Sequence, residues 1–464
     1  MTPNLPAGSP SYEYVEKLEA LGCAFPTFRA LGPQAFGDVR AALNWDPETT
    51  KCQAPEWLLD ERLILLQPAL SPELRSEILA SPPGPTLLRG TASSIWPVFA
   101  QRENRPMLDT VFANEFYLGF QSGIRGVGYA LSITPGFAGL FDLSSTWLGR
   151  FYVQEFSIKI GVGFSELTFA RQARRFGQTA HGSLLFSAAS APIDALEYTL
   201  RPVLTPGLLS YLGPVEFRTW FGGQATSSGA VGAQLWGIEL GMRPSRLWEI
   251  AFMELFQFGG LGTTRLGIGE TLLLPFLGGG SALAGLRNTA LALHTGFWFP
   301  GHFAKIYGQA LLDRVGDTVP AEFSFLAGLW LPRIGRWDAR FEFARTGPAA
   351  YQHPVWTQGL VYRDAPLGHP LGPDALGMYL DVALPPIALW WRGKVGFSSE
   401  ARALSIVNPE RRLGVMVELD RRWRFADLAL QLAYQRVDSA GYAAVSEDVF
   451  AAGLRLRYSF LPNQ

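Results

Sequence analysis

The segments Leu413–Leu419 (LGVMVEL) and Leu428–Tyr434 (LALQLAY) decide the fold class of this 464-residue chain. In each, an apolar side chain stands at every second position, and the positions between hold small or polar residues such as Gly414, Glu418 and Gln431. A period of two residues is typical of a β-strand whose two faces meet different environments. The turn after the first segment is short and polar, so the two segments predict neighbouring antiparallel strands.

The segment near the C-terminus indicates which environments the two faces meet. Its positions alternate between an apolar set, Leu454, Leu456, Tyr458 and Phe460, and a polar set, Arg455, Arg457 and Ser459. An arginine that faces lipid at the middle of a membrane costs about 2–4 kcal/mol. We therefore expect Arg455 and Arg457 to face the lumen of a barrel. The alternative is a soluble barrel or sandwich with an apolar core, but the small and polar residues of the other face fit a wet lumen better.

The composition agrees with a barrel in a bacterial outer membrane. Only 17% of the residues are charged, against about 25% in soluble proteins. The sequence lacks an apolar run of about 18 residues, which a membrane-spanning helix needs; Thr271–Gly285 comes nearest but carries a proline and four glycines. At about 10 membrane residues per strand, the chain after residue 84 predicts a mainly β fold, a transmembrane antiparallel β-barrel of about 18 strands.

Residues 1–84 are expected to form a small N-terminal α-helical bundle, followed by the barrel over residues 85–464. Apolar residues recur here at helical spacing, and the linker Ser81–Pro85 (SPPGP) ends the segment. The first ten residues do not resemble a signal peptide, so we expect an exported protein in mature or truncated form. Cys23 and Cys52 could form one disulfide in an oxidising periplasm; two buried free thiols are the alternative.

A long loop between two alternating strands, Arg171–Asp194 (RQARRFGQTAHGSLLFSAASAPID), is the first candidate site. A loop of this length is usually functional or mobile. Its candidate polysaccharide-binding residues are Arg171, Arg174, Arg175, Phe176 and His181. The arginines could bind uronic-acid carboxylates as bidentate forks, bind lipopolysaccharide phosphates, or be solvated.

A second group of candidate contact residues lies late in the chain. They are Glu342, Arg345, His369 and Asp374. Glu342 and Arg345 are expected to face the lumen and to pair, either as a structural ladder of charges or as polymer contacts. His369, in the block LGHPLGPDA, could anchor neighbouring backbone or bind a ligand, and Asp374 favours a turn as well as a polar contact. We expect this block to lie beside the loop Arg171–Asp194.

In several blocks the chain resembles the capsule-assembly Wzi family of outer-membrane proteins, over nearly its whole length. The blocks, in chain order, are YVEKLEALG, FGDVRAAL, Phe176–Gly177, Ser183–Ser187, Ala191–Pro192, Leu255–Gly260, Tyr307–Gln309, Phe341–Thr346 and Leu367–Ala375. At two positions the chain departs from the family pattern: Phe176 stands where tryptophan is frequent, and Ala189 where asparagine is. The resemblance implies an 18-stranded barrel, a helical bundle at its periplasmic mouth, and a role in holding or exporting surface polysaccharide.

The sequence lacks catalytic and cofactor motifs. Its five histidines are scattered, and no HExxH, CxxC, GxSxG or P-loop pattern occurs. A triad of His181, Ser183 and Asp194 is conceivable, but nothing in the sequence fixes its geometry. We therefore expect no enzyme activity, no metal and no cofactor. Nucleic acid is not expected as a partner, because the sequence has no basic patch with interleaved aromatic residues.

The sequence thus predicts a bacterial outer-membrane protein of capsular polysaccharide or exopolysaccharide assembly, which binds, anchors or exports the polymer through its loops and lumen. The expected partners are the surface polysaccharide, outer-membrane lipid or lipopolysaccharide, and a periplasmic polysaccharide-export protein. A plugged lumen would favour a cell-surface lectin, and an open water path would favour an export channel. The alternative function is a general or solute-specific porin unrelated to capsule.

Overall fold

The computed structural model describes most of the chain after residue 85 and two short pieces before it. The described residues are 16–19, 31–32, 86–102, 110–124, 127–141, 147–187, 192–202, 211–223, 232–260, 287–299, 302–313, 321–334, 337–353, 360–362, 365–384, 391–422, 426–439 and 445–460.

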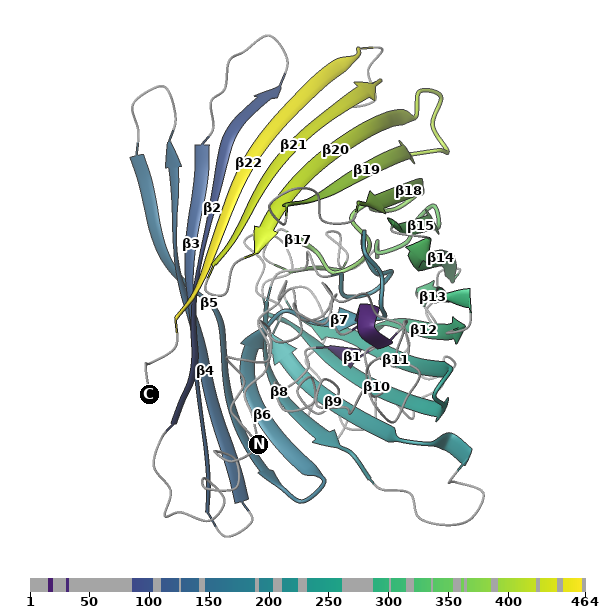
Figure 1. The fold of residues 1–464 in the computed structure, drawn as a ribbon. Coiled ribbons are helices and arrows are strands. Elements are labelled where there is room, and N and C mark those ends of the chain that lie inside the picture. Colours follow the sequence, from purple (N-terminus) through teal and green to yellow (C-terminus); the bar gives the residue numbers. More distant parts are fainter. Residues whose placement is uncertain are drawn as a thin grey trace.

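Within this part of the chain, eighteen strands form one closed antiparallel barrel (Figure 1). They are β2 (Thr86–Arg102), β3 (Thr110–Ile124), β4 (Val127–Phe141), β5 (Trp147–Val162), β6 (Ser165–Gln172), β8 (Ile193–Leu200), β9 (Val215–Gly223), β10 (Ala233–Ser245), β11 (Trp248–Gly259), β12 (Arg287–Phe299), β13 (Ala304–Asp313), β14 (Glu322–Ile334), β15 (Trp337–Arg345), β18 (Ala375–Ala383), β19 (Trp391–Arg402), β20 (Glu410–Arg422), β21 (Ala426–Asp438) and β22 (Glu447–Phe460). The barrel closes because β2 pairs with β22 as well as with β3. The predicted antiparallel barrel is therefore confirmed.

The described remainder consists of short pieces. Strand β1 (Leu31–Gly32) pairs with β7 (Arg175–Phe176), and β16 (Val361–Tyr362) pairs with β17 (Ala365–Pro366). Residues 16–19 are helical. Among the described residues, no helix is long and apolar enough to cross a membrane. The rest of the predicted N-terminal bundle, with Cys23 and Cys52, lies outside the described residues, so the bundle and the disulfide stay predictions.

The two ends of the barrel differ in the length of their connections. At one end, residues 125–126, 163–164, 246–247 and 335–336 join neighbouring strands; at the other, the joining segments include residues 173–192 and 346–374. Outer-membrane barrels have short periplasmic turns and longer extracellular loops. We call the two ends the short-turn mouth and the long-loop mouth, and assign the first to the periplasm and the second to the cell exterior.

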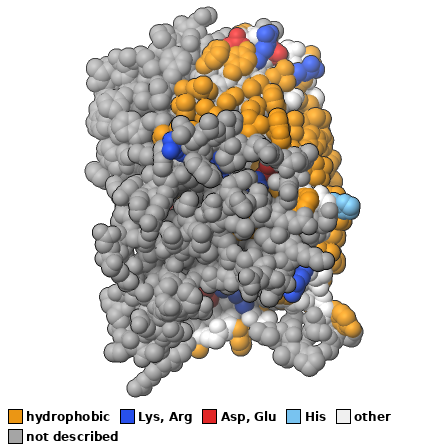
Figure 2. Space-filling model, viewed as in Figure 1, with side chains coloured by type: hydrophobic (Ala, Val, Ile, Leu, Met, Phe, Trp, Pro, Cys, Tyr) orange, Lys and Arg blue, Asp and Glu red, His pale blue; other side chains and the backbone are white. Residues whose placement is uncertain are grey.

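The alternation in the sequence corresponds to the two faces of the barrel wall. Leu413 and Val415 of β20 are exposed, as are Leu167 and Phe169 of β6, whereas Thr168 between the latter two is fully buried. Figure 2 shows the described hydrophobic side chains as a broad patch on the outer surface. A wall that is apolar outside is the form that lipid requires.

The inner face of the described wall carries charges in pairs. Lys159 Nζ lies 2.7 Å from a carboxylate oxygen of Glu166 on the neighbouring strand, and both side chains are buried. A buried charge is tolerated only when an opposite charge and hydrogen bonds compensate it. The side chains of Arg455 and Arg457 lie outside the described residues, so their lumen position stays a prediction.

Candidate functional site

Two long connections at the long-loop mouth fold into the barrel and meet there. We call the described part of residues 173–192 the first lumen loop and the described part of residues 346–374 the second lumen loop. Leu185 and Gly368 form an antiparallel bridge, and the Phe186 N–H donates to the Leu367 carbonyl at 2.6 Å. The prediction that the block LGHPLGPDA lies beside the first loop is confirmed.

Gln309 of β13 holds the first lumen loop against the wall. Its Oε1 lies 3.0 Å from Ser183 Oγ and accepts from the Leu184 N–H at 2.8 Å, while its Nε2 donates to the Phe176 carbonyl at 2.9 Å. These groups are buried, so breaking the bonds would leave them unpaired at a cost. A Cβ at Gly177 would lie 1.8 Å from Gln309 Nε2, which explains why a glycine follows Phe176.

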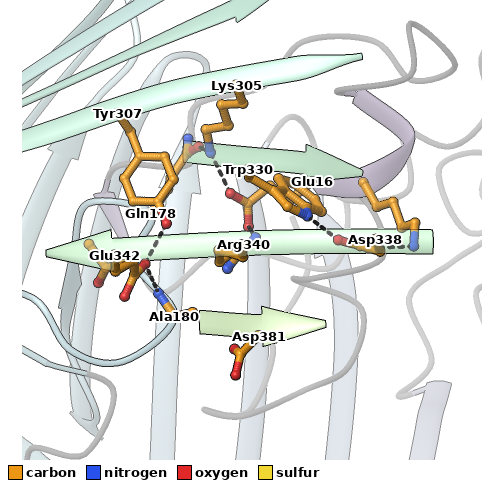
Figure 3. A network of polar contacts seen from close by, with 12 residues as sticks. Glu16, Gln178, Ala180, Lys305, Tyr307, Trp330, Asp338, Arg340, Glu342 and Asp381 are labelled. Carbon is orange, nitrogen blue, oxygen red and sulfur yellow. Dashed lines mark hydrogen bonds and ion pairs between the residues drawn. The ribbon is translucent and has the colours of Figure 1, made fainter. Parts of the chain in front are cut away.

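Glu342 of β15 anchors the tip of the same loop (Figure 3). Its carboxylate accepts from the backbone N–H of Ala180 at 2.7 Å and of His181 at 2.9 Å, and also from the hydroxyl of Tyr307. The predicted pair with Arg345 was wrong. Residues three apart in a strand point to opposite faces, so only one of the two can face the lumen.

Two of the loop's arginines form contacts within the protein and are partly exposed to solvent. Arg171 forms a bidentate fork with Asp194, at 2.5 and 2.8 Å, and the Arg171 side chain is 24% exposed. Arg175 donates to the Thr179 carbonyl at 2.8 Å and is half-buried. Both guanidinium groups therefore help to fold the loop.

Arg174 is a structural cation of the lumen. It bonds to Glu197 of β8 at 2.8 Å and its guanidinium carbon lies 4.0 Å from the ring centroid of Trp220. The side chain is 2% exposed. The prediction that it could be solvated was wrong, because an inward-facing acid and an aromatic ring enclose it.

His181, Ser183 and Asp194 do not assemble into a triad. His181 Nε2 lies 3.0 Å from Asp381 Oδ2, and its ring stacks on Tyr379 with centroids 4.4 Å apart. Ser183 faces Gln309 and Asp194 faces Arg171, as described above. In the described part of the chain, no group of three His, Cys, Asp or Glu residues could hold a metal ion.

His369 is a buried anchor of the second lumen loop. Its Nδ1 accepts a hydrogen bond from the Leu371 N–H at 3.2 Å, and the residue is fully buried. Burial, and after it the nearby His181 and Arg402, lower the pKa of the His369 imidazole to about 3. The ring is therefore neutral at ordinary pH and accepts the backbone bond without a charge.

Asp374 ends the second lumen loop with a turn and a polar contact. Its backbone has a φ of 50°, a conformation that aspartate tolerates better than most residues. The carboxylate accepts from the Ser405 N–H at 2.7 Å and from the Ser405 hydroxyl at 2.6 Å, and lies 3.9 Å from Arg345. Asp374 thereby ties the loop to the connection after β19.

Burial divides the nine candidate contact residues into two groups. Those largely hidden from solvent are Arg174, Phe176, Glu342, His369 and Asp374. Those partly accessible are Arg171, Arg175, His181 and Arg345. A polymer could touch the first group only if the lumen loops opened, so their roles in the closed barrel are structural.

A cationic and aromatic group at the short-turn mouth was not predicted from the sequence. We call it the mouth cluster, and its members are Arg243, Trp298, Lys305, Trp330 and Arg340. Lys305 and Trp298 flank one short turn, and the other three lie near the same ends of β10, β14 and β15. In the sequence, a tryptophan and a basic residue flank a short turn twice, as Trp298 with Lys305 and Trp330 with Arg340. This pattern could have indicated the cluster, but only closure of the barrel brings the separate turns together.

Comparisons with known proteins agree with this architecture. The family model described as "Capsule assembly protein Wzi" matches residues 27–384. Among solved structures, the chain is similar to Wzi of Escherichia coli, described as an outer-membrane protein involved in group 1 capsule assembly and a carbohydrate-binding β-barrel. That match has a TM-score of 0.69 and 14% identity, and it covers 99% of this chain and 100% of that one.

Two proteins of Pseudomonas aeruginosa share the fold more distantly. OccK11 (OpdR) has a TM-score of 0.50 at 12% identity, covering 80% of this chain and 95% of its own. OpdL has a TM-score of 0.50 at 8% identity, covering 82% and 98%. A search of curated proteins found no match. The family model matches most of the length of this chain. The chain therefore belongs to the Wzi family of capsule assembly proteins, and it is a bacterial outer-membrane β-barrel with a role in capsule polysaccharide assembly.

Proposed function

We propose that this protein binds surface polysaccharide at its long-loop mouth and holds it on the cell, as a lectin that catalyses no reaction. The observation that carries the proposal is the packing of the two lumen loops. Leu184, Leu185, Phe186 and Leu367 of these loops are fully buried in a core that includes inward-facing residues of the wall, such as Trp220. Loops packed inside the lumen support a holding role over an export channel.

The energetics of this core favour a barrel that stays closed at rest. Fully burying one Leu or Phe side chain stabilises it by about 1.5–3 kcal/mol relative to exposure. Opening a path beside β9–β18 would expose several such side chains and break the bonds to Gln309 and Glu342. Spontaneous opening wide enough for a polysaccharide would therefore be rare.

The surface available to the polymer is a set of arginines at the ends of strands around the long-loop mouth. They are Arg171 of β6, Arg345 of β15, Arg402 of β19 and Arg412 beside it on β20, with side chains 24%, 31%, 23% and 27% exposed. Each lies near an acid of the chain. Arginine binds carboxylate and sugar oxygens through N–H groups held in a rigid fork, and the exposed part of each guanidinium faces the region where a sugar chain would approach.

The other proposed partners are outer-membrane lipid and a periplasmic protein, and each is assigned to a different surface of the barrel. Outer-membrane lipid covers the apolar wall, and a periplasmic polysaccharide-export protein would approach the short-turn mouth. The arginines at the opposite end are the contacts that the polymer itself would use.

The test is deletion of the gene, followed by measurement of cell-attached and released polysaccharide. We expect deletion to move polymer from the cell to the medium and the wild-type gene to restore it. A complementing variant with R402Q and R412Q should restore less, whereas R392Q at the short-turn mouth should restore fully. Unchanged attachment after deletion would contradict the proposal. Swelling of liposomes by small sugars, without polysaccharide binding, would favour the porin alternative.

A further inference from the structure

The mouth cluster is built from stacked cations and tryptophans. The guanidinium carbon of Arg243 lies 4.6 Å from the ring centroid of Trp298, and that of Arg340 lies 4.3 Å from Trp330. Lys305 Nζ lies 5.0 Å from the Trp298 centroid. Each distance is within the range of a cation–π contact. Three positive charges and two indole faces thus share one region at the periplasmic end of the lumen.

The helical piece at residues 16–19 places carboxylates on these cations. Glu16 pairs with Lys305 and lies 3.9 Å from Arg340, while Glu19 pairs with Arg243. Residues three apart lie on the same side of a helix, so the two acids reach the cluster together. Figure 3 shows Glu16 between Lys305 and Arg340, with Trp330 beside it.

The charge of Glu16 is maintained by the cluster. Burial alone would raise the pKa of its carboxyl, but Lys305, then Arg340 and Arg175, outweigh burial and lower that pKa to about 2. The site therefore stabilises a buried carboxylate strongly enough to overcome desolvation. Any other carboxylate that reached the same position would meet the same cations.

Polar groups beside the acids are left without partners. Among the described residues, the indole N–H of Trp298 and both ring nitrogens of His294 are buried and form no hydrogen bond. Buried polar groups are nearly always paired, so these atoms are positioned to pair with the hydroxyl groups of a ligand bound in the cluster. Two glutamates supply negative charge but no hydroxyl groups for these atoms.

The chemistry of the cluster matches that of an acidic sugar. Arginine binds carboxylates as a rigid fork, an aromatic face offers an apolar platform, and a sugar's hydroxyls can pair with an indole N–H or an imidazole nitrogen. The site also contacts the first lumen loop, because Gln178 bonds to Lys305 and, at 2.9 Å, to Glu249. A ligand here would lie on the periplasmic side of the loops that fill the lumen.

We propose that the mouth cluster is a binding site for the uronic-acid residues of an acidic polysaccharide, and that Glu16 and Glu19 occupy it as an internal competitor which the polymer displaces. This deepens the proposed function by naming an acidic polymer and a second, periplasmic contact. If the acids served only to dock the N-terminal segment, neutralising them would loosen that segment without creating affinity for a sugar.

The first experiment measures binding of hexagalacturonate to the full-length protein in detergent micelles by calorimetry. The variant E16Q/E19Q keeps the shapes of both side chains and removes the competing charges. We expect it to bind at least about tenfold more tightly than wild type, equal to about 1.4 kcal/mol. Addition of K305M to this variant should abolish the gain, and neutral maltohexaose should show none.

The matched control is E418Q/D420N. It removes two carboxylates from β20 near the same mouth, where Asp420 pairs with Arg392 at 2.5 Å rather than with the cluster. An equal gain in this control would show a general effect of net charge and overturn the proposal. No gain in E16Q/E19Q would also overturn it.

A second experiment uses the wild-type protein, so it does not depend on the folding of a variant. Saturating hexagalacturonate should accelerate amide hydrogen exchange at residues 16–19, because the displaced segment loses its contacts. Hexagalacturonate binding that leaves this exchange unchanged would contradict displacement. Neither measurement depends on cell attachment of the polymer. Gene deletion could release polymer while E16Q/E19Q shows no gain in affinity, which would overturn only the mouth-cluster site. Attachment could also be unchanged while E16Q/E19Q binds more tightly, which would overturn only the proposed lectin function.

Discussion

At the scale of single residues, the packing of the lumen loops depends on buried polar groups with specific partners. His369 is an example, because it is fully buried and its imidazole accepts a backbone hydrogen bond. Protonation would place a buried charge beside His181 and Arg402, which disfavour a further positive charge. The second lumen loop should therefore be sensitive to acid.

We predict that the stability of the protein falls as pH decreases from about 6.5 towards 3. The folded pKa of His369 is about 3, below the ordinary value of about 6.5, so the unfolded chain takes up a proton first. The contribution of the neutral ring is thus fully present above pH 6.5 and declines as pH falls. The measurement is the thermal midpoint at pH 7.5, 5.5 and 4.

The variant H369Q tests the assignment. It keeps an acceptor without a titratable ring, so its midpoint should fall less between pH 7.5 and 4 than that of wild type. H302Q, at an exposed histidine in the turn before β13, serves as the matched control and should behave as wild type. If H369Q shows the full wild-type dependence, another group causes the acid sensitivity.

Residue roles were the least predictable feature of the sequence. Glu342 was expected to pair with Arg345, three positions away, but it binds the backbone of Ala180, 162 positions away. From the sequence, Arg174 could bind a carboxylate, bind a phosphate or be solvated. In the structure it is enclosed by Trp220 and Glu197. Local pattern shows which face a strand residue occupies, whereas its partner depends on a loop that folds back across the lumen.

At the scale of elements, strands and lumen loops differ in what determines them. The strands follow from an alternation that each segment carries in itself, and β20 and β21 pair as the opening segments predict. The lumen loops have no such period. Their positions depend on contacts with wall residues such as Gln309 and Glu342, so the sequence indicated two neighbouring loops but not that both pack inside the barrel.

We predict that Q309M loosens the first lumen loop without disturbing the barrel. Methionine is similar in size but cannot replace the bonds to Leu184 and Phe176, and unpaired buried groups cost about 1–3 kcal/mol. Trypsin cleavage after Arg174 or Arg175 should become about tenfold faster or more. Q435M, at a half-buried position of β21, is the control and should leave the cleavage rate unchanged. Equal rates in Q309M and wild type would show that Gln309 does not hold the loop.

At the scale of the whole molecule, the barrel combines an apolar outer wall, a charged inner face and two loops packed inside the lumen against the wall from β6 to β18. The outer wall matches lipid, and the paired charges inside allow the loops to pack at little electrostatic cost. The two mouths offer different surfaces. The long-loop mouth presents arginines at the ends of strands, and the short-turn mouth holds the mouth cluster with Glu16 and Glu19. Such an arrangement suits a protein that holds polymer rather than one that passes solutes freely.

The central claim is that the lumen loops close the barrel, and planar-bilayer conductance tests it most directly. Purified wild-type protein should insert without forming a sustained sugar-permeable pore, whereas a variant with residues 173–192 replaced by an Asn-Gly turn should conduct. A wild-type barrel that conducts steadily and admits small sugars, to the same extent as the loop-deleted variant, would contradict the account.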